Sequence, residues 1–566
     1  MNMWGRKMLP VFMALAMGVT AACSNSGANS GTAAEGNTDA KQPAQAQTNT
    51  DPLGKYATPI TVNWARDMDT SFKFPEGQNI DNNVWYTEYE KELGIKIKNT
   101  FVATGDQYTQ KVSIAMTTDD LPDMLQVGAI EFQQLIEGGM IEDLTAVFEK
   151  YGSKQLKDYA AADSRIIDTA KADGKLMGIP TALGNFDGSK MIWIRKSWLD
   201  KLGLAEPKSM QDIFNISEAF TKKDPDGNGK NDTYGLLANK AFYVGGYGEF
   251  EGFFNGFNAF PKFWIKDASG KLVYGSVQPQ AREALLKLQA MFKDGQIDPE
   301  FAVKDSKKAA ELLINGKIGM MFGANWNPIL PLIDSMKKEP EAGWRAYPLM
   351  TIDGKPGKAQ VEMTPKSFYV VKKGYKNPEA LIKMINYHLN IRVNATKEQF
   401  DRLIEIPKGD GTTFEAFKYT PVFNLAPPDK NHLIYLSVNE ALKSKDTSKL
   451  NPEMMRVYND IQGYEGGNVG QWPFWRIHKE SPNAARTIIA EYMKQNLFQI
   501  NEFMGTKTPG MIDKQSTLDK MELEVFTKIV MGAPIEDFDK FVADWKKLGG
   551  DQITKEVNDW AAKAKK

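Results

Sequence analysis

Residues 224–235 carry oxygen-bearing side chains at the spacing of a calcium-binding loop. Four of them fall at positions 1, 3, 5 and 9 of this segment: Asp224, Asp226, Asn228 and Asp232. In such a loop alternate residues point inward, and a glycine at position 6, here Gly229, permits a sharp turn. Position 7, here Lys230, contributes its backbone carbonyl oxygen. We therefore predict a structural calcium ion that this loop holds and that pins the flanking elements.

The same segment departs from a complete EF-hand loop at its last position. Position 12 is Gly235 instead of the glutamate that binds calcium through both carboxylate oxygens. A sixth protein ligand is therefore undefined, and water or a later carboxylate could complete the shell. The alternative to a calcium site is a solvated turn rich in Asp, Gly and Asn.

Residue patterns typical of enzymes are absent from the sequence. The three histidines, His388, His432 and His478, lie far apart and form no His-Glu-x-x-His motif. The Gly-rich segment 227–230 is followed by Asn231, so it is not a phosphate-binding loop. A glycosidase needs only two carboxylates at a suitable separation, which a sequence does not reveal. We predict that the chain is not an enzyme and keep a polysaccharide hydrolase or lyase as an alternative.

The composition bounds the class of protein. The chain has 566 residues, of which 42% are hydrophobic and 25% charged, as in ordinary globular proteins. Lys and Arg number 70 and Asp and Glu 71, so the net charge is -1. This balance offers no electrostatic footprint for nucleic acid. The length suffices for two or more domains.

The N-terminal region predicts export and anchoring. A positively charged start precedes apolar residues 8–19 and then small residues, which predicts a secretory signal peptide over residues 1–22. The only cysteine, Cys23, follows directly and resembles the lipidated cysteine of a bacterial lipobox. Residues 24–50 contain no aromatic or branched aliphatic residue, so we predict a lipidated cysteine and disordered tether over residues 23–56. The alternative is an ordinary signal peptide followed by an incidental cysteine.

The body of the chain alternates short apolar runs with amphipathic segments, which predicts an α/β fold. Residues 60–64 and 95–102 read as strands around a helix at 84–93 that stops at Gly94. Residues 318–322 read as a later strand.

Several segments together resemble the extracellular solute-binding lipoproteins of bacterial ABC sugar importers, family 1, in their large oligosaccharide-binding branch. The segments that carry the resemblance occur in order along the chain: 178–181 (GIPT), 194–204 (IRKSWLDKLGL), 224–232 (DPDGNGKND), 293–301 (KDGQIDPEF), 316–323 (GKIGMMFG), 538–541 (FDKF) and 545–550 (WKKLGG). Alginate-binding members of this branch carry a similar calcium loop, with an acidic residue where Thr233 stands here.

The resemblance implies a two-lobed fold of the type II periplasmic-binding-protein class. Each lobe would be an α/β sheet sandwich, and the ligand would bind in a cleft between the lobes. We expect residues 57–180 and about 350–395 to form lobe 1, and residues 181–349 and about 396–566 to form lobe 2. The lobes of such proteins close around their ligand like a hinge.

Tryptophans in loop-like contexts are the candidate ligand-binding residues. Sugar rings have apolar faces, and a tryptophan ring offers a flat surface with an N–H donor at its edge. The candidates are Trp326, just past a strand end, Trp64 and Asp67 at the end of the first strand, and Trp472, Trp475 and Arg476 in a Gly/Pro-containing segment. For each tryptophan the alternative is core packing.

The resemblance also implies the partners. The chain would capture an oligosaccharide at the extracellular face of the cell membrane, held there by its N-terminal lipid, and deliver it to ABC permease subunits as a monomer. The alternative binding function is that of a lipoprotein for peptides or proteins.

Overall fold

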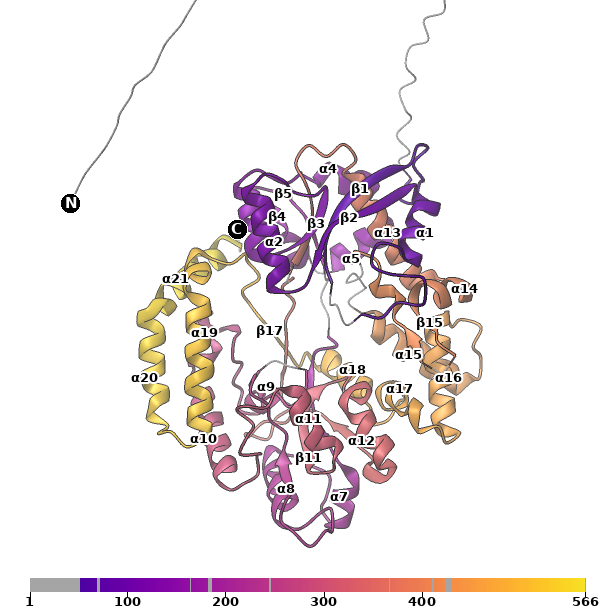
Figure 1. Ribbon diagram of the computed structural model, residues 1–566. Coiled ribbons are helices and arrows are strands. Elements are labelled where there is room, and N and C mark those ends of the chain that lie inside the picture. The colour runs from indigo at the N-terminus through magenta and orange to yellow at the C-terminus, as the bar shows by residue number, and fades with distance from the viewer. Residues whose placement is uncertain are drawn as a thin grey trace, which may run out of the picture. The chain divides into compact units, whose positions relative to one another are not determined.

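The computed structural model describes residues 51–68, 72–162, 164–181, 186–243, 246–365, 367–409, 412–422 and 429–564 (Figure 1). All of these residues belong to one compact unit. The predicted signal peptide, the lipidation site Cys23 and residues 24–50 of the predicted tether lie outside the described residues. Within the described ranges, no helix combines the length and the apolar character that crossing a membrane requires.

The first lobe is built on a five-stranded sheet in the order β2-β1-β3-β14-β6. Its strands are β1 Ile60–Asp67, β2 Ile95–Ala103, β3 Met124–Gly128, β6 Ile179–Pro180 and β14 Ser367–Val371. β1 runs parallel to β2 and β3, whereas β14 runs antiparallel to β3 and β6. The chain thus leaves this sheet after β6 and returns to it with β14, as two-lobed folds require.

Helix α1 (Val84–Leu93) shows how the sequence sets the boundaries of a helix in this lobe. The Asn83 side chain accepts hydrogen bonds from the backbone N–H groups of Trp85 and Tyr86 at the helix start. Gly94 ends the helix at φ 68°, a conformation that costs glycine little. The helix predicted over 84–93 is confirmed.

The second lobe is built on a four-stranded sheet in the order β12-β7-β11-β8. Its strands are β7 Lys190–Ile194, β8 Tyr234–Leu236, β11 Ile318–Ala324 and β12 Arg345–Tyr347. Every residue of β11 is buried, as expected of a central strand covered on both faces. β11 pairs with β7 antiparallel and with β8 parallel. The strand predicted at 318–322 is confirmed and extends two residues further.

C-terminal helices complete the second lobe. They are α19 Pro509–Val530, α20 Glu536–Trp545 and α21 Asp551–Ala564. α19 and α20 run side by side (Figure 1) and pack Phe526 against Phe541, with ring centroids 5.2 Å apart. A short parallel pair of β13 (Ala359–Val361) and β17 (Phe498–Ile500) joins segments far apart in the chain.

The remaining helices and short strands lie around these two sheets or form small units of their own. The helices are α2 Asp106–Thr117, α3 Ala129–Glu137, α4 Thr145–Tyr151, α5 Lys154–Ala162, α6 Ser164–Asp168, α7 Lys196–Lys201, α8 Met210–Lys222, α9 Glu251–Asn255, α10 Pro279–Lys293, α11 Ser306–Ile314, α12 Ile333–Lys338, α13 Glu379–Asn394, α14 Lys397–Gln399, α15 Lys430–Ser444, α16 Pro452–Glu465, α17 Trp472–His478 and α18 Ala485–Gln495. The short strands are β4 Lys171–Ala172, β5 Lys175–Leu176, β9 Trp264–Lys266, β10 Leu272–Tyr274, β15 Ile406–Pro407 and β16 Thr413–Phe414. Short 3-10 or π turns include η2 Pro328–Leu332.

The hydrophobic cores place one segment differently from the expected lobe boundaries. Phe400, Leu403 and Tyr419 are buried in the core of the first lobe. The family resemblance instead implies that residues from about 396 onward belong to the second lobe. The first hydrophobic core therefore includes side chains from the segment after α13, up to at least Tyr419. The exact division of the chain between lobes stays a prediction.

Candidate functional site

Trp326 lies in a turn directly after the central strand β11 of the second lobe. Side-chain amides hold the backbone on both sides of it. Asn325 Nδ2 donates to the carbonyl of Asp187 at 2.6 Å, and Asn327 Nδ2 donates to the carbonyl of Gly246 at 3.0 Å. The indole itself is only half-buried. The turn thus presents a fixed aromatic ring that solvent can reach.

Gly246 provides the surface on which the Trp326 ring lies. A Cβ atom at Gly246 would come within 2.9 Å of Trp326 Cη2, and Gly246 has φ +92°. Only glycine meets both conditions without strain. The N–H of Gly246 donates to Glu249 Oε1, and Glu249 Oε2 pairs with Lys190 Nζ at 2.5 Å. A buried ion pair therefore supports the position of the ring.

Glu251, next to this ion pair, has an unusual acidity. Burial, together with the charges of Glu249 and Glu362, raises the pKa of Glu251 to about 7, and Lys190 opposes the shift. A carboxyl group whose pKa is higher in the folded than in the unfolded chain stabilises the fold when it is protonated. That contribution is complete below the unfolded pKa and is lost as the pH rises through 7.

Between about pH 5 and pH 8 the free energy of unfolding of the parent chain should fall as Glu251 ionises. We expect this fall to be about 2 kcal/mol smaller in the Glu251→Gln variant, which has no carboxyl group to ionise. The value is below the full shift because the Glu251 side chain is 19% exposed. Denaturant unfolding at both pH values measures the difference, and Glu90→Gln, at an exposed position of α1, is the matched control. Parallel pH profiles for parent and Glu251→Gln would contradict the assignment.

Trp472, Trp475 and Arg476 lie on α17, where the sequence suggested a loop. The loop prediction was wrong because Pro473, one of its signals, is well suited to the first turn of a helix. Trp472 is 1% exposed and belongs to the core. Trp475 is half-buried against Tyr464, and the Arg476 guanidinium lies 4.5 Å from the Trp475 ring centroid. Burial, aided by the charge of a neighbouring arginine, lowers the pKa of Arg476 to about 10.

α17 contacts the η2 turn that follows Trp326. The structure therefore brings the α17 candidates and Trp326 onto neighbouring segments of the second lobe. Trp64 and Asp67 lie apart from these, on β1 of the first lobe. Trp64 is 1% exposed and packs edge-on to Tyr369, so it contributes to the core here. Asp67 is half-buried, and burial raises its pKa, partly offset by a hydrogen bond from the backbone of Gly105.

Arg66, between these two residues, was not singled out from the sequence. It is 2% exposed and donates to the carbonyl oxygens of Lys418 at 2.7 Å and Thr420 at 3.0 Å. It also donates to the carbonyl of Tyr419. An arginine inside a largely apolar strand indicates a buried charge that needs partners. The sequence does not reveal those partners, because they lie more than 350 residues later.

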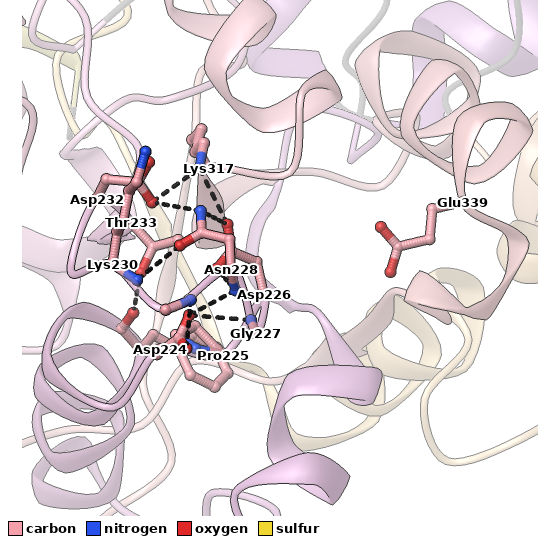
Figure 2. A network of polar contacts seen from close by, with 12 residues as sticks. Asp224, Pro225, Asp226, Gly227, Asn228, Lys230, Asp232, Thr233, Lys317 and Glu339 are labelled. Carbon is pink, nitrogen blue, oxygen red and sulfur yellow. Dashed lines mark hydrogen bonds and ion pairs between the residues drawn. The ribbon is translucent and has the colours of Figure 1, made fainter.

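The loop predicted to bind calcium adopts a turned conformation (Figure 2). The Asp224 carboxylate accepts backbone N–H groups of Gly227, Asn228 and Gly229, each at 3.0 Å. Gly229 has φ +77°, which agrees with the sharp turn expected at position 6. The Asp224 side chain therefore caps this turn by accepting three backbone hydrogen bonds.

The donor atoms of this loop have partners of their own. Lys317 Nζ pairs with Asp226 and with Asp232. Across the described part of the chain, no three His, Cys, Asp or Glu side chains are grouped so that they could hold a metal ion. The donor types are those that calcium prefers, but here the side chains do not gather into a metal site, and a lysine ammonium lies against two of the carboxylates.

Comparison with known proteins identifies relatives. The family described as bacterial extracellular solute-binding protein matches residues 74–390. Lipoprotein LipO of Bacillus subtilis is 23% identical over 498 residues, which cover 83% of this chain and 87% of LipO. The fructooligosaccharide ABC transporter substrate-binding protein FusA of Streptococcus pneumoniae is 30% identical over 155 residues, covering 25% of this chain and 28% of FusA.

Solved structures share the fold. FusA in complex with kestose has a TM-score of 0.62 at 16% identity, covering 90% of this chain and 100% of FusA. Alginate-binding protein AlgQ2, solved without calcium ion, has a TM-score of 0.58 at 16% identity, covering 90% of this chain and 99% of AlgQ2. An EF-hand mutant of FusA has also been solved. The expected two-lobed fold is confirmed, and because the family match spans more than half of the sequence, this chain belongs to the bacterial extracellular solute-binding protein family.

Proposed function

We propose that this chain captures an oligosaccharide outside the cytoplasm and delivers it to an ABC importer. The observation that carries the proposal is the half-buried Trp326, held by Asn325 and Asn327 in a protein of the solute-binding family. A rigid aromatic face is the feature that a sugar ring needs for apolar contact. A structural relative solved with a sugar, FusA in complex with kestose, supports the same ligand class.

We further propose that the ligand contacts residues from both lobes. Trp326, Trp475 and Asp67 keep partly exposed side chains and are suited to direct contact. Trp64 and Trp472 are buried and would support the site from behind. Arg476, which is 7% exposed, would hold the Trp475 ring in place by its cation–π contact. Closure of the lobes would favour the ligand-bound state through its additional contacts.

The N-terminal region supplies the proposed location. Lipid attached to Cys23 and a flexible tether over residues 24–50 would keep the domain at the extracellular face of the membrane. There a monomeric chain could pass its ligand to permease subunits. LipO, whose name describes a lipoprotein, supports this arrangement.

We also propose that the 224–232 loop can hold a structural calcium ion. Asp224, Asp226, Asn228 and Asp232 would supply side-chain oxygens, and Lys230 its backbone carbonyl. The spacing of these donors and the turn at Gly229 support the proposal. The metal would serve the fold of the second lobe, because calcium crosslinks segments through hard oxygen ligands.

A thermal-shift panel on the full chain tests the sugar proposal. The panel contains neutral fructo-oligosaccharides, acidic alginate oligosaccharides and short peptides. A ligand that binds only the folded chain stabilises it by about 2.7 kcal/mol at a concentration of 100 times its Kd. We expect one sugar class to raise the Tm. A rise with peptides alone would refute the sugar proposal and favour a peptide-binding lipoprotein.

A further inference from the structure

A lysine from outside the 224–232 loop lies against its carboxylates (Figure 2). Lys317 Nζ lies 3.0 Å from Asp226 Oδ2 and 2.8 Å from Asp232 Oδ1. Asn228 Nδ2 donates to the same two oxygens at 2.9 and 3.0 Å. An ammonium and an amide thus bridge two carboxylates that would otherwise repel each other.

The sheet fixes Lys317 beside the loop. Its N–H donates to the carbonyl of Leu312 at 2.9 Å, and its own carbonyl accepts the N–H of Tyr234 at 2.8 Å. Tyr234 in turn pairs with Ile318 in the parallel register of β8 and β11. The register that builds the second sheet therefore also brings the Lys317 side chain to Asp232, two residues before Tyr234.

Two positions that are acidic in similar calcium loops, position 12 and the position of Thr233, supply no carboxylate here. The Thr233 hydroxyl donates to the carbonyl of Phe220 at 2.7 Å, and Thr233 is only 2% exposed, so it points into the core. At position 12, a Cβ atom on Gly235 would lie 2.2 Å from Ser217 Oγ and 2.4 Å from the Ser217 carbonyl oxygen. No glutamate fits there. The loop is thus limited to the carboxylates of its first nine residues.

We infer that Lys317 is the resident cation of this loop and keeps it folded in the absence of calcium. A calcium ion needs the oxygens of Asp226 and Asp232 that the ammonium now contacts, and two cations so close together repel each other. Calcium therefore enters only when the ammonium leaves. This second step rests on the proposal that the loop can hold calcium, whereas the first concerns the metal-free chain alone.

Lys317→Met tests the inference because it removes the charge and keeps a long apolar side chain. The full chain, Lys317→Met and Lys223→Met are unfolded by heat in EDTA and in millimolar calcium chloride. Lys223 is exposed at the C-terminal end of α8, directly before the loop, so Lys223→Met is the matched charge control.

Because Lys317 takes the place of the metal in EDTA, the parent chain and Lys223→Met are expected to show only a small difference in Tm between EDTA and calcium. Lys317→Met is expected to lose about 2 °C or more in EDTA, to recover in calcium, and to bind calcium about tenfold more tightly than the parent chain in a calorimetric titration. The inference would be overturned if the Tm of the parent chain fell in EDTA as far as that of Lys317→Met. It would also be overturned if Lys317→Met had the same Tm in EDTA as the parent chain. A Tm loss that calcium does not restore would support the role of Lys317 and refute the calcium proposal instead.

Discussion

Replacing Trp326 by alanine is expected to weaken oligosaccharide binding about 30-fold or more while the chain stays folded. Removal of a central aromatic anchor typically costs at least 2 kcal/mol of binding free energy, or about 30-fold in Kd. The effect on folding is smaller, because the ring is half-buried and amides of Asn325 and Asn327 hold its turn. Calorimetric titration with the sugar identified by the thermal-shift panel measures the Kd of parent and variant.

Trp560→Ala is the matched control for this experiment. Trp560, on the C-terminal helix α21, is also half-buried, but its ring packs edge-on against Phe503. We expect it to lower the Tm modestly and to leave the Kd unchanged. Trp326→Phe should recover part of the affinity, because a smaller ring still offers an apolar face. Equal affinities of Trp326→Ala and the parent chain would remove Trp326 from the site.

Arg66→Met is expected to destabilise the first lobe by about 3 kcal/mol, since three carbonyl groups, two of them buried, lose a charged donor. Arg66 donates to the carbonyls of Lys418, Tyr419 and Thr420 at the C-terminal end of the short 3-10 helix η5 (Ala416–Lys418). The free energy of unfolding in denaturant gives the total effect. Hydrogen exchange should show the largest loss of protection in residues 412–422.

Arg282→Met is the matched control, because it removes an arginine that has no contacts with backbone carbonyls in the described part of the first lobe. Arg282 forms an exposed pair with Asp539 at 3.6 Å, and such surface pairs contribute little to stability. We expect its free energy of unfolding to stay close to that of the parent chain. If Arg66→Met unfolded at the same denaturant concentration as Arg282→Met, the carbonyl contacts of Arg66 would not matter for stability.

The fold was predictable from the sequence where local signals decide the structure. Asn83 and Gly94 bound α1 because a cap and a left-handed residue act within one turn. The apolar run of β11 ended close to its predicted end because buried central strands are continuously apolar. The position of Trp326 in a turn after that strand followed from the same pattern.

Contacts between distant residues could not be predicted in this way. Lys317 reaches Asp232 across 85 positions, and Arg66 reaches Thr420 across 354. Burial of Trp64 and Trp472 likewise depends on packing partners elsewhere in the chain. A tryptophan near a strand end or a glycine looks the same in sequence whether it faces a ligand or the core. Local sequence patterns therefore supplied the candidate residues, and tertiary contacts decide which of them keep exposed side chains.

The most direct test of the central claim is an incubation of the full chain with the sugar that raises its Tm. The amount bound per chain is measured by calorimetry, and the sugar is then recovered and analysed by mass spectrometry. Our account predicts one oligosaccharide per chain, recovered intact after prolonged incubation. Shortened or unsaturated sugar products would contradict it and identify the chain as a hydrolase or lyase.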